Sequence, residues 1–161
     1  MNRQQRRMEL KALKHKTNRS RVQMNNYFQL EFETFETIER LFEMMRNGSL
    51  LWDGKSWVIM GQQGVLVDIT YSLGWWLRYW KTIANRAGKQ YDDTAMVRLL
   101  KSLEYHKPLT IDEVNKAYDV VKMQRWLYRN AGAKLVSQTV DELKKVQEQE
   151  EMKELLRKVA A

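Results

Sequence analysis

Cysteine is absent from this sequence, proline occurs once and histidine only twice. Without cysteine the chain can form no disulfide framework, no thiolate metal site and no thiol nucleophile. The two histidines, His15 and His106, lie in different segments and do not have the paired spacing that binds zinc. We therefore expect no metal ion and no other cofactor.

Long apolar runs are also missing. No stretch approaches the roughly 20 apolar residues that are needed to cross a bilayer. The charged N-terminus has no apolar segment of the kind found in a secretory signal. We expect a cytoplasmic protein that has no membrane among its partners.

Motifs for catalysis are scarce as well. The segment 61–64, GQQG, has neither the spacing nor the lysine and Ser/Thr of a phosphate-binding loop. Asp92 and Asp93 form a carboxylate pair, but a helix start explains them. Four further polar residues lie near one another in the sequence and sit in turns or caps: Glu104, His106, Asp112 and Glu113. With no convergent motif, we expect a protein that is not an enzyme.

Positive charge is concentrated at the N-terminus. The chain has 161 residues, 43% of them hydrophobic, which suits one domain with a real core, and a formal net charge of +8. Residues 1–22 hold eight basic side chains against one acid, a net charge of +7, whereas the other 139 residues have a net charge of +1. The basic side chains are Arg3, Arg6, Arg7, Lys11, Lys14, Lys16, Arg19 and Arg21. Such an arm binds phosphate backbones by counterion release, and an acidic protein surface is the alternative partner.

The stretch from Ser72 to Gly88, SLGWWLRYWKTIANRAG, predicts the central helix. Ser72 can cap its start, and Gly88 can adopt the left-handed conformation that closes a helix. Apolar residues recur at three- and four-residue steps and predict one buried face: Leu73, Trp76, Leu77, Trp80, Ala84 and Ala87. The opposite side carries Trp75, Arg78, Tyr79, Lys81 and Arg86, and it either packs a second layer, is solvated or binds a partner.

The remaining elements follow from local signals. An aromatic stripe predicts a core helix from Asn25 or Asn26 to Met45, and Asp53-Gly54 predicts a tight hairpin within a three-stranded meander at 50–69. Further helices are predicted from Asp92 or Asp93 and from the capping box Thr110–Glu113 to about Asn130. Residues 130–132 break the chain before a final helix that carries Val136 and Val140, and Thr139–Glu142 has the pattern of another capping box. We expect Ile111, Val114, Tyr118 and Val121 to be buried.

Basic and aromatic residues alternate in two places. The first group is on the central helix, and the second comprises Lys122, Arg125, Trp126 and Arg129. Aromatic platforms beside cations are typical of surfaces that bind single-stranded nucleic acid. Macrodipole compensation at a helix C-terminus explains the cations of the second group equally well. Trp75, Tyr79, Trp126 and Tyr128 are the candidate anchors if the partner is a protein instead.

A resemblance in composition points in the same direction. The opening MNRQQRR and the cysteine-free body rich in Trp and Met resemble small accessory or virion proteins of tailed bacteriophages. The resemblance covers a few residues and the general composition, and it carries over no functional residue. It adds a virion to the expected locations.

The sequence thus predicts an α+β fold that is predominantly helical, with four to five helices around a Trp-rich central helix and a small three-stranded antiparallel β-meander. We expect a basic arm at 1–22, a globular core at 23–132 and a C-terminal helix at 133–161 that docks on a partner or a second copy. The first functional hypothesis is a non-enzymatic nucleic-acid-binding protein. The alternative is a protein-interaction factor, such as a virion component or an inhibitor of a host complex.

Overall fold

The computed structural model describes residues 5, 7–8, 34–60, 64 and 66–161. The chain divides into two compact units, Met1–Glu39 and Arg40–Ala161. In the first unit residues 5, 7, 8 and 34–39 are helical, and the side chain of Arg7 is exposed. The predicted boundary after residue 22 and the predicted helix start at Asn25 or Asn26 lie outside the described residues.

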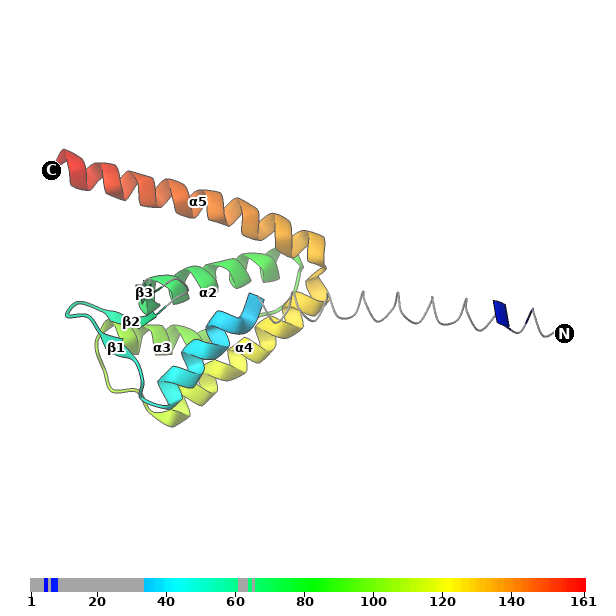
Figure 1. The fold of residues 1–161 in the computed structure, drawn as a ribbon, viewed down its shortest axis with the longest axis horizontal. Coiled ribbons are helices and arrows are strands. Elements are labelled where there is room, and N and C mark those ends of the chain that lie inside the picture. Colours follow the sequence, from blue (N-terminus) through cyan, green and yellow to red (C-terminus); the bar gives the residue numbers. More distant parts are fainter. Residues whose placement is uncertain (1–4, 6, 9–33, 61–63, 65) are drawn as a thin grey trace. The chain divides into compact units, whose positions relative to one another are not determined.

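The second unit is α+β and predominantly helical, as predicted. It begins with the end of the helix at 34–46, followed by a three-stranded antiparallel sheet and four further described helices. In chain order these are β1 (Leu51–Trp52), β2 (Trp57–Met60), β3 (Leu66–Asp68), α2 (Ile69–Arg86), α3 (Thr94–Glu104), α4 (Ile111–Ala131) and α5 (Ala133–Ala160) (Figure 1).

The sheet is the predicted meander, with strand order β1-β2-β3 and Trp52 opposite Trp57. The turn is wider than predicted, because four residues, 53–56, connect the first two strands. The Asp53 carboxylate closes this turn by accepting hydrogen bonds from the backbone N–H groups of Ser56 (2.8 Å) and Lys55 (2.9 Å). These two bonds favour the charged carboxylate and lower the pKa of Asp53.

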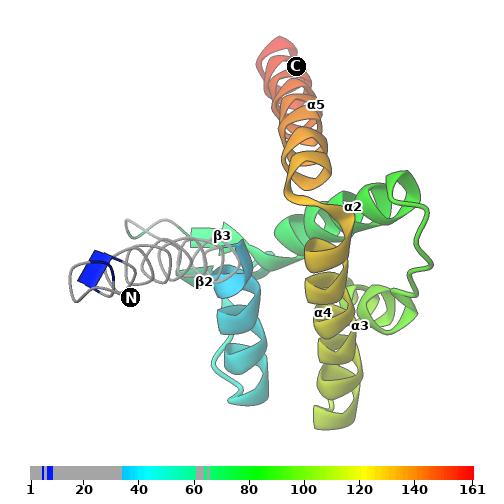
Figure 2. The same cartoon turned by 90° about the vertical axis from the view of Figure 1, so that its right-hand side faces the viewer.

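Helix α2 is the central element of the second unit. It contacts α3, α4, α5 and the strands β2 and β3, and it lies between α5 on one side and α3 on the other (Figures 1 and 2). The predicted start at Ser72 is wrong, because the carboxylate of Asp68 accepts a hydrogen bond from the N–H of Tyr71 (3.2 Å) and caps the helix about one turn earlier. The predicted end is confirmed, with Gly88 at φ 63°.

Helices α3 and α4 begin at the predicted N-terminal caps. Asp92 accepts hydrogen bonds from the hydroxyl (2.6 Å) and the N–H (3.0 Å) of Thr94, which lower its pKa, while Asp93 occupies the N-cap of α3 without a side-chain bond. Thr110 caps α4 by accepting from the N–H of Glu113 (3.1 Å). The Glu113 carboxylate does not complete the box, because it accepts from the hydroxyl of Ser102 (2.6 Å).

The second predicted capping box is wrong. Gly132, at φ 87° and ψ 138°, is the one residue between α4 and α5, so α5 already begins at Ala133. Thr139 therefore lies inside a continuous helix, fully buried, and its hydroxyl accepts a hydrogen bond from Arg86 (3.2 Å). The break predicted at residues 130–132 is confirmed at Gly132, so only the capping role of Thr139 is wrong.

Burial in α4 follows the predicted face with one exception. Val114 and Val121 of α4 are buried and Tyr118 is partly buried, whereas Ile111 is 68% exposed. Ile111 is the first residue of α4, and its side chain tilts toward the N-terminus, away from the packed part of the helix. Within Arg40–Ala161 the core includes Leu41, Phe42, Val58, Ile59, Leu73, Leu77, Trp80, Ile83, Met96, Leu99, Leu103, Val120 and Leu127.

Candidate nucleic-acid interface

The exposed side of α4 carries the second basic–aromatic group. Trp126 is 48% exposed, and Lys122 and Arg129, one turn before and after it, are exposed too. The ammonium of Lys89, from the loop after α2, lies 5.7 Å from the centre of the Trp126 ring. We call Lys89, Lys122, Arg125, Trp126 and Arg129 the α4 face.

Its charge comes from the second half of α4. Residues 120–131 contain Lys122, Arg125 and Arg129 and no Asp or Glu. Lys122 Nζ lies 3.3 Å from Asp119 Oδ1, an exposed pair three residues apart that contributes little and is screened by salt. The same ammonium lies 5.7 Å from the centre of the Tyr118 ring, so aromatic and cationic groups alternate along the helix.

Arg46 extends this alternation from a neighbouring helix. Its guanidinium stacks over the Tyr118 ring at 4.3 Å from the centroid, and its Nε donates to Asn115 Oδ1 (3.3 Å). The Tyr118 ring in turn lies 5.5 Å from the ring of Phe42, which is fully buried. The exposed cations thus rest on aromatic rings that the core holds in place.

Gln124, on the opposite side of α4, fixes the helix in the core. Trp76 Nε1 donates to Gln124 Oε1 (2.7 Å), and Gln124 Nε2 donates to the hydroxyl of Tyr91 (2.6 Å). Burial raises the pKa of Tyr91 far above its usual range. Sequence reasoning missed this network, although a glutamine within the apolar spacing of α4 is a signal for a buried polar contact.

The first basic–aromatic group does not form a surface. Trp75 is only 8% exposed, so its predicted role as a partner anchor is wrong. Tyr79 is half-buried, and its hydroxyl donates to Gln147 of α5 (2.8 Å). This side of α2 packs a second layer, which was one of the alternatives drawn from the sequence, and the second layer is α5.

Ion pairs join α2 to α5. Arg78 pairs with Glu150 (3.3 Å), and Arg86 pairs with Glu142 (2.6 Å). We call the contact of α2 with α5 the α2–α5 seam. Its polar residues on α5 recur at helical spacing and could have been recognised in the sequence: Thr139, Glu142, Gln147, Glu150 and Glu151.

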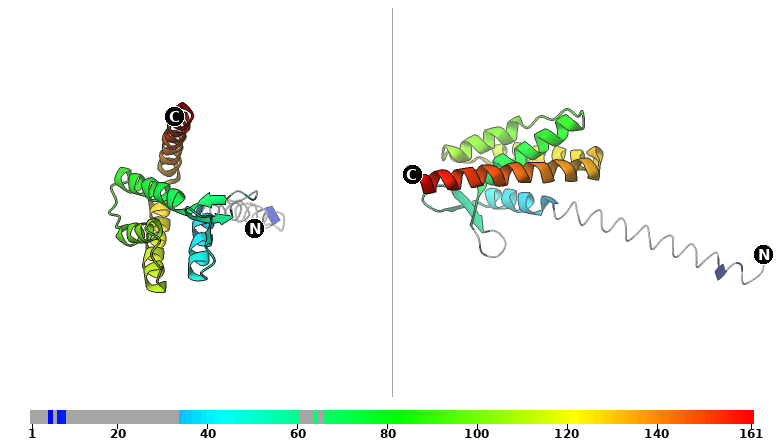
Figure 3. Two further views of the ribbon diagram at one scale, coloured as in Figure 1. Left: turned by 90° about the vertical axis from the view of Figure 1, so that its left-hand side faces the viewer. Right: turned by 90° about the horizontal axis from the view of Figure 1, so that it is seen from above.

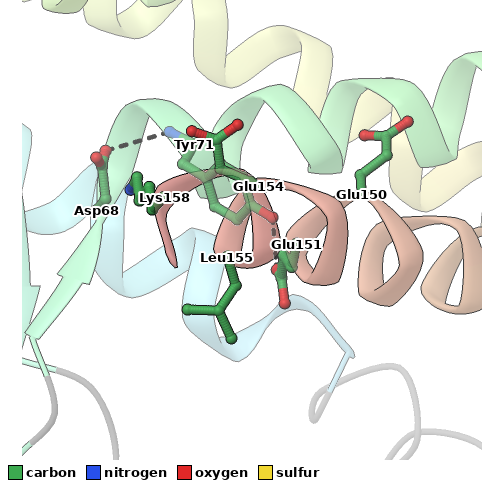
Figure 4. A pocket seen from close by; sticks show the side chains of 7 residues that line it. All are labelled: Asp68, Tyr71, Glu150, Glu151, Glu154, Leu155 and Lys158. Carbon is green, nitrogen blue, oxygen red and sulfur yellow. Dashed lines mark hydrogen bonds between the residues drawn. The ribbon is translucent and has the colours of Figure 1, made fainter. Parts of the chain in front are cut away.

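A hollow of about 370 Å³ lies at the end of the seam (Figure 4). Its lining residues come from the start of α2 and the last turns of α5, two helices whose courses can be followed in Figure 3. The Tyr71 hydroxyl donates to Glu151 Oε1 (2.5 Å), and the pKa of Tyr71 is raised by desolvation first and by this carboxylate second. Glu150 and Glu154 pair with Arg78 and Arg157. Because these carboxylates already have protein partners and most of the lining surface is apolar, the hollow does not have the character of a cation site.

A second hollow, of about 440 Å³, lies next to the C-terminal end of α3. It is lined by Met45, Gly48, Leu50, Trp57, His106, Lys107, Pro108 and Leu109. The His106 ring meets the Trp52 ring edge to face at 4.4 Å, and Trp52 lies 5.3 Å from the ring of Trp57. This hollow is apolar and aromatic, with a lysine among its lining residues.

Most of the predicted arm lies beyond the part of the chain that the structure describes. This holds for Arg3, Arg6, Lys11, Lys14, Lys16, Arg19 and Arg21, whereas Arg7 is a helical residue with an exposed side chain. Among the residues that the structure does describe, no group of three or more His, Cys, Asp or Glu side chains could hold a metal ion, and no helix is long and apolar enough to cross a membrane.

Comparisons of this chain with protein-family models, with curated proteins and with solved structures give no match. The geometry of the described residues is therefore the basis for the functional proposal.

Proposed function

We propose that this protein binds single-stranded nucleic acid without catalysis, through the α4 face and the basic arm. The observation that carries the proposal is the exposed ring of Trp126, whose centre lies 5.7 Å from the Lys89 ammonium. The surrounding part of α4, residues 120–131, has three basic residues and no acidic one. An exposed indole can stack on an unpaired base, while neighbouring cations contact the phosphates on either side.

The charge distribution along α4 favours a single strand over a duplex groove. Helices that read a major groove use their N-terminal residues. The first turn of α4 instead carries Asp112 and Glu113, which repel phosphates. The cations and the exposed tryptophan are at the other end of the helix, where they suit a strand that crosses the surface.

The eight basic residues of the arm, from Arg3 to Arg21, complete the proposal as phosphate contacts that do not depend on base sequence. Substitutions in the arm and at Trp126 should then have different effects on the affinity and on its dependence on salt. Arm contacts contribute affinity and salt dependence, whereas Trp126 contributes affinity that survives added salt. A cytoplasmic or virion location is compatible with either set.

The test is a fluorescence-anisotropy titration of the full chain with labelled single-stranded and duplex DNA and RNA at two salt concentrations. We expect W126A to weaken single-strand binding by roughly 5- to 100-fold, the range for loss of one stacked base. The matched control is W52A, because Trp52 is 45% exposed and lies outside the α4 face. The affinity of W52A for single strands should equal that of the unsubstituted chain.

Substitution of the arm separates its contribution. A chain with Arg3, Arg6 and Arg7 all changed to Gln should show a smaller dependence of affinity on salt, by about 0.7 in the logarithmic slope for each phosphate that the arm no longer binds. If the unsubstituted chain binds no nucleic acid at low salt, the proposal is wrong. If W126A and W52A behave alike, the α4 face is not the site.

One observation supports the alternative of a protein-interaction factor. The last turns of α5 expose Met152, Leu155, Leu156 and Val159, each between 56% and 79%. They recur at steps of three and four, a stripe that could dock on another helix or on a second copy. Analytical ultracentrifugation of the chain and of L156E tests self-association, and the alternative gains support if the chain self-associates and L156E does not.

A further inference from the structure

Three helices of the second unit end in the same way. The backbone N–H of Gly48 donates to the carbonyl of Met45 (3.3 Å), and that of Ser49 donates to Met44 (2.9 Å). After α2, Gly88 and Lys89 make the same two bonds, three and five residues back. This pair of bonds defines a Schellman closure, in which the first donor has a positive φ.

The third closure, at the end of α3, uses histidine in place of glycine. His106 donates to Leu103 (3.3 Å) and Lys107 donates to Ser102 (2.9 Å), with His106 at φ 55°. It is the one non-glycine residue with a positive φ among those that the structure describes. Glycine adopts this conformation without the steric cost that a Cβ brings. The backbone alone therefore favours glycine here, and the imidazole needs a separate reason.

The reason we consider is the position of His106 at a hollow large enough for a small molecule. His106 and Lys107 both line the 440 Å³ hollow, whose walls are otherwise apolar. The Trp52 ring holds the imidazole edge to face at 4.4 Å. Strained backbone conformations of this kind concentrate at binding sites, where the position of a side chain matters more than the local cost.

The size of the hollow and the chemistry of its lining residues indicate which kind of ligand would fit it. Its volume is within the range of small-molecule sites, and the walls formed by Met45, Trp57 and Leu109 suit a flat apolar group. The polar side chains among the lining residues are those of Lys107 and His106, and an ammonium and an imidazole N–H are both donors that can bind an anion. No Asp or Glu is among the described lining residues. We infer that this hollow is a binding site for a small amphipathic anion, an aromatic or short acyl group that bears one carboxylate, sulfonate or phosphate.

Two dyes with the same ring system test this inference on the full chain. The dye 8-anilinonaphthalene-1-sulfonate carries the anion, and N-phenyl-1-naphthylamine lacks it. We expect saturable binding of the sulfonate dye, with energy transfer from tryptophan, and affinity for the neutral dye weaker by about tenfold, the usual effect of losing one charge-assisted hydrogen bond. Equal affinity for the two dyes would overturn the inference.

Substitutions locate the dye. L109W should fill the hollow and abolish saturable binding, and K107Q should weaken only the sulfonate dye, by about tenfold. Lys101 is an exposed lysine on α3 that does not line the hollow, so K101Q is the matched control and should bind normally. L156E controls for dye bound to the exposed stripe of α5. If L109W binds as well as the unsubstituted chain, or if L156E alone loses binding, the site is elsewhere.

H106G gives the sharpest result, because stability and binding should move in different directions. Glycine relieves the left-handed backbone, so the melting temperature should be unchanged or higher, while sulfonate-dye affinity falls about threefold to tenfold. H106N, which tolerates the same backbone conformation without an imidazole, should also lose affinity. If both variants keep full affinity, His106 serves only the helix end and the inference fails.

Discussion

The two basic–aromatic groups of this chain look alike in sequence and differ in structure. On α2, Trp75 is 8% exposed, and the arginines beside it pair with glutamates of α5. On α4, Trp126 is 48% exposed, and the ammonium of Lys89, from the loop after α2, lies 5.7 Å from the centre of its ring. The two groups differ because α5, a helix far along the chain, packs on the α2 group and covers it. A run of tryptophan and arginine does not stay at the surface when another helix of the same chain packs on it, as α5 packs on α2.

The largest expected effect is on stability. W75A should lower the free energy of unfolding by about 3–5 kcal/mol, because it removes a large side chain from a closed seam. W126A should change it by less than about 1 kcal/mol, because the ring is half exposed. Urea denaturation followed by circular dichroism measures both. Equal losses would show that the two groups do not differ in packing.

The second prediction concerns charge. Changing Lys122 and Arg129 together to Gln should reduce the logarithmic salt slope of single-strand binding by about 1.4, at 0.7 for each phosphate bound. The matched variant changes Arg78 and Arg86 to Gln in the α2–α5 seam and should leave both slope and affinity unchanged. A seam variant that loses affinity would contradict the division of roles.

The third prediction concerns the Tyr79–Gln147 hydrogen bond and pH. Y79F should cost about 0.5–1.5 kcal/mol near neutral pH. Desolvation, then Tyr71 and Glu151, raise the pKa of Tyr79 above its usual 10, so the neutral hydroxyl stabilises the fold below that pH.

This contribution is lost as pH rises through the folded-state pKa. The stability difference between the chain and Y79F should therefore shrink above about pH 10. Urea denaturation from pH 7 to 11 measures it, and a difference that grows with pH would have the wrong sign.

The smallest effect is expected for the exposed ion pairs of the seam. The side chains of Arg86 and Glu142 are 41% and 59% exposed, so a double-mutant cycle between them should give a coupling of about 0.2–1 kcal/mol. Added salt should reduce this coupling. A larger, salt-insensitive value would show that the pair is more desolvated than its exposure indicates.

The fold was predictable from the sequence wherever a local signal decides the structure. Gly88 and Thr110 mark helix ends through their own backbone or side-chain chemistry, and the alternation around Asp53-Gly54 gives the meander. Ser72 and Thr139 were wrongly predicted as caps, because both residue types cap helices well but here lie inside helices. Asp68 caps α2 before Ser72 is reached, and the sequence alone does not decide between these two adequate caps. The break at Gly132, by contrast, was predicted from residues 130–132.

The candidate site was predictable in part. Lys122, Arg125, Trp126 and Arg129 were recognised from their spacing. In the structure Lys122, Trp126 and Arg129 are exposed, and Arg125 is partly buried. Lys89 was missed, because its approach to Trp126 depends on how the loop after α2 is folded. The burial of Trp75 was not decided by sequence for the same reason, since α5 follows it by more than fifty residues.

Gly132 has a consequence for how copies of this chain can exchange parts. With φ 87° and ψ 138°, it holds a backbone conformation that other residues rarely adopt, and it alone reverses the chain between two long helices. Replacing it with alanine favours one uninterrupted helix through α4 and α5. The seam residues of α5 would then reach α2 of a neighbouring copy, a domain-swapped dimer that size-exclusion chromatography of G132A would detect.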